Sequence, residues 1–153
     1  MLDALLEELR GLHDEPGPVA DPDFPFVLSA GERRSSTANT IFRDPGWRRK
    51  DPSGALRLST TDAEALGIAE GDAARVTTRR GSAVAVVEVT DTLLPGHASL
   101  PNGFGVGEAG DSVGVAPNEL TSGADRDWLA GTPHHKHVPA RIERLEPQPV
   151  GAS

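Results

Sequence analysis

The chain has 153 residues, the length of one domain with a single core, and it has no cysteine, which excludes disulfides, thiolate zinc sites, cysteine nucleophiles and protein-ligated iron–sulfur clusters within it. Its net charge of −8 argues against general nucleic-acid binding, and no apolar run approaches the ~20 residues of a membrane helix. We therefore expect a soluble protein that binds neither nucleic acid nor membrane, with the cytoplasm as its default location.

The first predicted elements are a helix and a linker. Leucines recur with helical spacing at Leu2, Leu5, Leu6, Leu9 and Leu12. Three prolines between Asp14 and Asp23 favour an extended linker. We expect residues 1–23 to be this helix and linker, residues 24–145 to be the folded domain, and residues 146–153 to be a flexible tail. The helix is either a lid packed on the domain or the remnant of a preceding domain.

The rest of the chain is dominated by strand signals. Strands are predicted at Phe26–Ser29, Leu56–Ser59, Asp72–Arg79, Ser82–Thr90, His97–Leu100 and His137–Leu145. A two-turn helix begins with a capping box from Thr61 to Glu64 and ends at Gly67. Arg80-Gly81 predicts a tight hairpin in which the glycine takes a positive φ. Many short strands with one or two short helices indicate a mainly β, closed barrel.

Two motifs are interpreted as structural. Gly105–Gly110 matches G-x-G-x-x-G, but Gly114 and Pro117 follow where a phosphate-binding helix must begin, so we expect a flexible loop. His134, His135 and His137 suggest a metal, yet only His135 and His137 can share one face of an extended segment. No carboxylate lies close in sequence, and we expect a surface turn.

A basic segment follows the first predicted strand. Between Gly31 and Lys50 there are six basic and two acidic residues, a local charge of +4, so the remainder carries −12. A basic island on an acidic body attracts a small anion such as a pyrophosphate. The alternative is an ordinary solvated loop.

Three segments, Ser29–Thr40, Ala116–Thr121 and Gly131–Lys136, share their order and spacing with one family. They resemble loops of the C-terminal molybdopterin dinucleotide-binding domain of molybdopterin oxidoreductases, the formate dehydrogenase, nitrate reductase and DMSO reductase group. The resemblance runs from about Phe24 to Leu145, and the Leu66–Asp72 turn is similar to one in double-psi β-barrels. It implies a mainly β double-psi β-barrel that binds molybdopterin guanine dinucleotide (bis-MGD).

The resemblance also implies a set of contact residues. Arginines and hydroxyls suit phosphate oxygens, glycine lets backbone approach closely, and asparagine amides match the edge of guanine or pterin. The implied cofactor-binding residues are Gly31, Arg33, Arg34, Ser35, Thr37, Asn39, Thr40, Asn102, Asn118 and Lys136. Many relatives carry histidines or aromatic residues where this chain has Ser35, Ser36 and Thr37, so ring stacking on the cofactor is expected to be missing.

The resemblance implies that the chain binds the cofactor and supplies no catalytic residue. It would be the last domain of a molybdenum or tungsten oxidoreductase, and a formate dehydrogenase-like enzyme is one option for that parent protein. The metal and any iron–sulfur cluster would belong to the catalytic domains of the parent enzyme, which are the expected partners. The alternative is a stand-alone barrel adaptor that binds a protein through its basic loop or leading helix. Convergence of Asn102, Asn118 and Lys136 on one cleft favours cofactor binding, and dispersal favours the adaptor.

Overall fold

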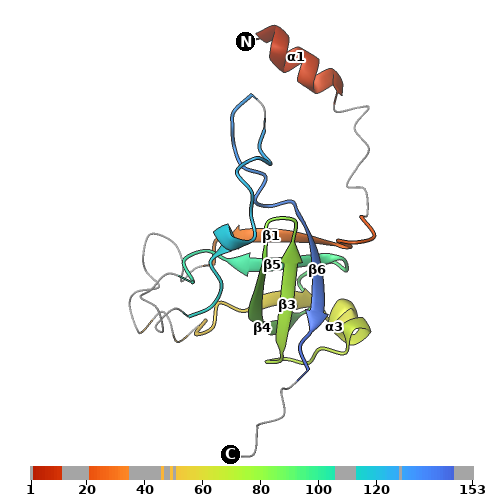
Figure 1. The fold of residues 1–153 in the computed structure, drawn as a ribbon, viewed down its shortest axis with the longest axis vertical. Helices are drawn as coiled ribbons and strands as arrows, with labels where there is room; N and C mark the ends of the chain where they lie inside the picture. The colour runs from red at the N-terminus through yellow and green to blue at the C-terminus, as the bar shows by residue number, and fades with distance from the viewer. Residues whose placement is uncertain are drawn as a thin grey trace, which may run out of the picture.

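Six strands close into a barrel in the order β1-β5-β2-β4-β3-β6 (Figure 1). The computed structural model describes residues 2–11, 21–34, 46, 49, 51–105, 113–127 and 129–146. Its elements are α1 (Leu2–Gly11), β1 (Phe26–Glu32), β2 (Leu56–Ser59), α3 (Thr60–Leu66), β3 (Ala73–Thr78), β4 (Ser82–Thr90), β5 (His97–Pro101), the 3₁₀ helix η2 (Pro117–Glu119) and β6 (Val138–Arg144). The predicted mainly β closed barrel with short helices is confirmed.

Two pairs of neighbouring strands are parallel. β1 runs parallel to β5, from Val27 opposite His97 to Glu32 opposite Pro101, and β2 runs parallel to β4. The other neighbours are antiparallel. Because β1 and β5 are parallel, the segments that leave their C-terminal ends emerge at the same end of the barrel. The chain after Glu32 and the chain after Pro101 therefore begin side by side.

The interior of the barrel is filled with aliphatic side chains. Burial alternates along β1 and β3, as the two-residue period of a strand requires. The largest fully buried side chains are Leu28, Leu56, Leu58, Leu100, Leu120, Val76, Val87 and Pro101. With its interior occupied in this way, a small barrel presents ligand sites at its ends and on its outer loops.

The predicted cap of the second helix is wrong by two residues. Ser59, not Thr61, is the N-cap of α3: its Oγ accepts the Asp62 N–H at 3.1 Å and donates to Asp62 Oδ2 at 2.7 Å. Both sites offer a hydroxyl three residues before an acid, and the end of β2 at Ser59 decides between them. Gly67 ends the helix in the left-handed conformation, as predicted.

The β3–β4 hairpin is confirmed, but the reason given for its glycine is wrong. Gly81 does not take a positive φ. A Cβ on Gly81 would instead lie 3.0 Å from the carbonyl oxygen of Glu119. The glycine therefore permits the close approach of η2 to the hairpin.

Helix α1 is amphipathic, as predicted, and none of its residues is buried. Its leucines are exposed by 41 to 70%. Within the described residues, no helix has the length and apolar character needed to cross a membrane.

Candidate functional site

A groove of about 420 Å³ lies where three distant parts of the chain meet. It is lined by Ala30, Asn102, Asn118, Thr121, Ser122, Gly123, Pro133 and His135. The first comes from β1, the second follows β5, and the others belong to η2 and the segment between η2 and β6. That segment rises away from the barrel before it returns to β6 (Figure 1). The groove thus unites parts of all three segments that carry the family resemblance.

The position of Asn118 is fixed by Leu120, two residues further along the chain. Leu120 is fully buried, and its carbonyl oxygen accepts the Thr78 hydroxyl at 2.9 Å. Its own N–H donates to the Pro117 carbonyl at 3.0 Å, which closes the 3₁₀ turn. Asn118 lies inside this turn and is exposed. The turn is fixed while the amide side chain stays accessible to a ligand.

Asn102 is fixed by the end of β1. Its N–H donates to the Glu32 carbonyl at 2.9 Å, just beyond an irregularity in the β1–β5 pairing between Ala30 and Glu32. Gly31 lies in this irregularity with φ of 105°, and a Cβ there would lie 2.7 Å from Asn102 Oδ1. Gly31 therefore makes room for the Asn102 side chain.

The third wall comes from the segment before β6. The Ala30 N–H donates to the His135 carbonyl at 2.8 Å and ties this segment to β1. Lys136 is exposed and follows His135, but it is not among the residues that line the groove. Two of the three residues expected to converge therefore share the groove, and the third is adjacent to it in the chain.

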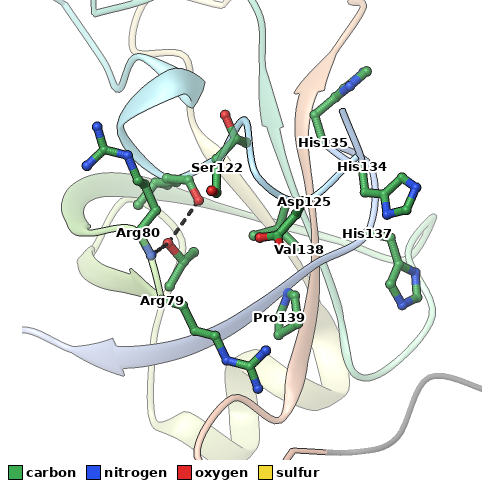
Figure 2. Close-up of a pocket in the computed structure, with 12 residues that line it drawn as sticks. Arg79, Arg80, Ser122, Asp125, His134, His135, His137, Val138 and Pro139 are labelled. Atoms are coloured by element: carbon green, nitrogen blue, oxygen red, sulfur yellow. Dashed lines mark hydrogen bonds between the residues drawn. The ribbon is translucent and has the colours of Figure 1, made fainter. Parts of the chain in front are cut away.

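A smaller hollow of about 190 Å³ adjoins the groove and shares Thr121, Ser122 and His135 with it. In Figure 2, Ser122 and Asp125 lie between Arg80 on one side and His134 and His137 on the other. His134 to His137 forms a turn, closed by the His137 N–H and the His134 carbonyl at 3.1 Å. Over the part of the chain that the structure describes, no three histidine or acidic side chains are grouped to hold a metal ion.

Beside the groove lies a group of five charged side chains, here called the Arg34 cluster: Glu32, Arg34, Asp51, Arg57 and Glu88. Arg34 is the buried centre, with its side chain 6% exposed. Its Nε, Nη1 and Nη2 donate to Glu32 Oε2 at 3.1 Å, Asp51 Oδ2 at 2.8 Å and the Ala55 carbonyl at 2.8 Å. Arg57 joins Glu88 at 2.9 Å to Glu32 at 3.2 Å. The cluster links β1, β2 and β4 to the segment before β2.

The two predicted phosphate-binding arginines have different surroundings. Arg33 is exposed, and within the described residues it forms no ion pair. Arg34 is buried and donates to carboxylates and a carbonyl. These contacts favour a structural role for Arg34. The predicted contacts at Ser35, Thr37, Asn39 and Thr40 lie outside the described residues, as does much of the glycine-rich loop before Val113.

The Glu32 carboxylate is ionised more readily than an ordinary glutamate. Partial burial raises its pKa, but the Ser99 hydroxyl, which donates at 2.6 Å, and the guanidinium groups of Arg34 and Arg57 lower the pKa by more. The net pKa of Glu32 lies below its ordinary value of 4.5. At neutral pH the cluster therefore holds Glu32 as an anion.

Several residues that line the groove are not among the predicted contacts: Ala30, Thr121, Ser122, Gly123, Pro133 and His135. Four of them, Ala30, Thr121, Pro133 and His135, lie inside the three resembling segments, so their membership was the available signal. Ser122 and Gly123 directly follow the second segment. Only the folded chain shows which of these face the groove.

Comparison with known proteins gives the family. The profile described as "Molydopterin dinucleotide binding domain" matches residues 26–139. The chain belongs to this family. The matched range begins at β1 and ends within β6, so it includes most of the barrel and every described residue of the groove.

Relatives of this dinucleotide-binding domain are much longer proteins. A tetrathionate reductase subunit from Salmonella typhimurium is 23% identical over 84% of this chain and 15% of its own length. The alpha chain of an F420-dependent formate dehydrogenase from Methanocaldococcus jannaschii is 28% identical over 83% and 18%. Acetylene hydratase from Pelobacter acetylenicus shares the fold, with a TM-score of 0.71 and 21% identity over 84% and 19%. The chain spans less than a fifth of each.

The fit of Gly31 against Asn102 predicts a cost for any side chain at position 31. Gly31→Ala is expected to lower the free energy of unfolding by about 2–4 kcal/mol, because left-handed strain and a steric clash add. Gly71→Ala is the matched control, with φ of 81° and nothing within 4 Å of its Cβ, and is expected to cost about 1–2 kcal/mol. Denaturant unfolding measures both. Equal costs would contradict the close packing of Gly31 on Asn102.

The lowered pKa of Glu32 predicts a pH dependence of stability. The contribution of Glu32 is fully present above its unfolded pKa of about 4.5 and is lost as pH falls through its lower folded pKa. The stability difference between wild type and Glu32→Gln should therefore shrink as pH is lowered from about 6 to 3. Glu64→Gln, at an exposed position on α3, controls for the loss of one carboxylate. A difference that stays constant over this range would contradict the ionic role of Glu32.

Proposed function

We propose that this chain binds molybdopterin guanine dinucleotide as the C-terminal, cofactor-capping domain of a molybdenum or tungsten oxidoreductase. The observation that carries the proposal is the meeting of Asn102 and Asn118 in one groove, from two separate parts of a family domain that binds such a dinucleotide. The groove binds and orients the cofactor, and no residue of this chain takes part in the redox step. The bound cofactor supplies the redox chemistry through its metal.

The chemistry of the groove fits the parts of this cofactor. Each asparagine offers an N–H donor beside a carbonyl acceptor, which complements the amide-like edge of a guanine or a pterin. Thr121 and Ser122 add hydroxyls to the same wall. These groups are carried on anchored backbone, so little conformational entropy is lost when they bind a ligand.

Arg33 is the described residue best suited to the pyrophosphate. It leaves β1 at the same end of the barrel as Asn102, and it is exposed. An arginine in this position can donate two parallel hydrogen bonds to phosphate oxygens. Lys136 adds a positive charge beside the groove wall. The hydroxyls and amides predicted between Ser35 and Thr40 remain proposed contacts of the same phosphates.

The names of the relatives separate cofactor binding from the reaction. Sequence relatives of this chain are named for tetrathionate, formate and nitrate. A domain shared by such different enzymes is suited to a common cofactor, whereas the other domains determine the substrate. A formate dehydrogenase-like parent is one proposal among these. Catalytic domains of the parent are the proposed partners, and the cytoplasm stays our expectation for its location.

The adaptor hypothesis also has an observation in its favour. Helix α1 exposes four leucines, which would suit a partner protein. The two asparagines of the groove, however, are carried on anchored backbone, which an adaptor that binds through α1 does not require. We therefore favour cofactor binding.

Asn118→Ala is expected to weaken cofactor retention about tenfold, because two hydrogen bonds to a ring edge are lost. The measurement is the pterin content of the protein isolated from its native source, read as fluorescent oxidised pterin, together with guanosine monophosphate released by hydrolysis. Asn102→Ala should act in the same direction.

Glu119→Ala is the matched control. Glu119 is exposed in the same 3₁₀ turn, but it lies outside the residues that line the groove. Its substitution should leave pterin content unchanged. Unaltered pterin and nucleotide content in both asparagine variants would contradict the proposed function.

A further inference from the structure

We propose that Arg34 is a positioning residue for the groove, which fixes Glu32 so that Asn102 is held in place to contact a ligand. This inference rests on the proposed function for the nature of the ligand, but its structural half concerns only the Arg34 cluster and Asn102. It assigns Arg34 a different task from that of its neighbour Arg33.

Arg34 is not available for a phosphate. Its side chain is 6% exposed, and its Nε, Nη1 and Nη2 atoms all donate within the protein. A buried charge is costly unless it is paired. Rotation of Arg34 toward a ligand would leave the Asp51 side chain, which is only 11% exposed, without its guanidinium partner.

Arg34 holds the Glu32 side chain together with two other donors. Glu32 Oε2 accepts from Arg34 Nε at 3.1 Å and from the Ser99 hydroxyl at 2.6 Å, and Oε1 accepts from Arg57 at 3.2 Å. Arg34 lies two residues after the end of β1, Ser99 belongs to β5 and Arg57 belongs to β2. Both carboxylate oxygens are thereby directed, and the end of β1 cannot rotate without breaking several charge-assisted hydrogen bonds.

The backbone of Glu32 is bonded directly to a residue of the groove. The Glu32 carbonyl accepts the Asn102 N–H at 2.9 Å, while Asn102 Oδ1 lies against the space that a Cβ of Gly31 would fill. The Glu32 side chain and backbone thus connect Arg34 to Asn102. A shift of the β1 end would change the position of Asn102 relative to Asn118 in the groove.

The three acceptors around Arg34 explain why an arginine, and not a lysine, suits this position. The planar guanidinium reaches Glu32, Asp51 and the Ala55 carbonyl in different directions at once. A lysine keeps the charge but cannot direct three donors in one plane. Arg34→Lys therefore separates the geometry of the cluster from its charge.

The first test uses the backbone and side-chain amide resonances of Asn102 in the ¹⁵N-labelled 153-residue chain. Arg34→Lys is expected to fold, to shift both resonances and to raise hydrogen exchange at the Asn102 amide. Asp51→Asn should produce shifts of the same kind, and it replaces Arg34→Lys if the latter does not fold. The control is Arg144→Met, which removes an exposed arginine 3.7 Å from Asp72 and should leave Asn102 unchanged.

The second test is the pterin content of the protein from its native source. Arg34→Lys should lose pterin to about the extent of Asn102→Ala, and Arg144→Met should retain it. Unchanged Asn102 resonances with full pterin content in Arg34→Lys would overturn the inference.

The two tests also separate this inference from the proposed function. If Asn102→Ala and Asn118→Ala keep their pterin while Arg34→Lys still displaces Asn102, the cofactor assignment fails and the positioning of Asn102 by Arg34 stands. If the asparagine variants lose pterin and Arg34→Lys retains it, the cofactor assignment stands and the positioning role fails.

Discussion

The parallel pairing of β1 with β5 is the constraint on which the candidate site depends. Parallel neighbours leave a sheet at the same end, so Glu32 and Pro101 finish opposite one another although they are far apart in the chain. Arg33 and Asn102 then follow from adjacent strand ends. The hydrogen bond from the Asn102 N–H to the Glu32 carbonyl extends this pairing by one more link into the groove. An antiparallel pairing of these two strands would send the segments to opposite ends.

Next to this strand pair, two consecutive arginines have different surroundings: one is buried and the other is exposed. Arg34 is directed inward and paired with Glu32 and Asp51, while Arg33 faces solvent. Separating a buried ion pair leaves a buried charge without a partner, which is costly, so the cluster resists rearrangement. The outward charge can then serve a ligand without any change in the fold. A fixed scaffold beneath accessible polar groups is what a cofactor with many hydrogen-bonding edges requires.

Most of the fold could be predicted from local patterns. The predicted bounds of β2 and β4 are those that the structure shows, because their ends coincide with turn or cap residues. The cap of α3 could not be placed, since Ser59 and Thr61 both precede an acid by three residues. The role of Gly81 depends on Glu119, which approaches only in the folded chain. Such long-range contacts leave no local signal.

Part of the candidate site could be predicted, and the part that could not again depends on long-range contacts. Asn102, Asn118 and Gly31 were found through the family resemblance, and the structure brings all three to one region. Nothing in the sequence separates Arg33 from Arg34. Their difference comes from Asp51 and the Ala55 carbonyl, which meet Arg34 only when β2 closes the barrel.

The measurement that tests the central claim most directly is the capture of the native protein from its source with an antibody against this chain. Its intact mass and its molybdenum and tungsten content are then determined. The account predicts a polypeptide several times longer than this chain that contains one of the two metals together with pterin. A metal-free and pterin-free protein of 153 residues would contradict it.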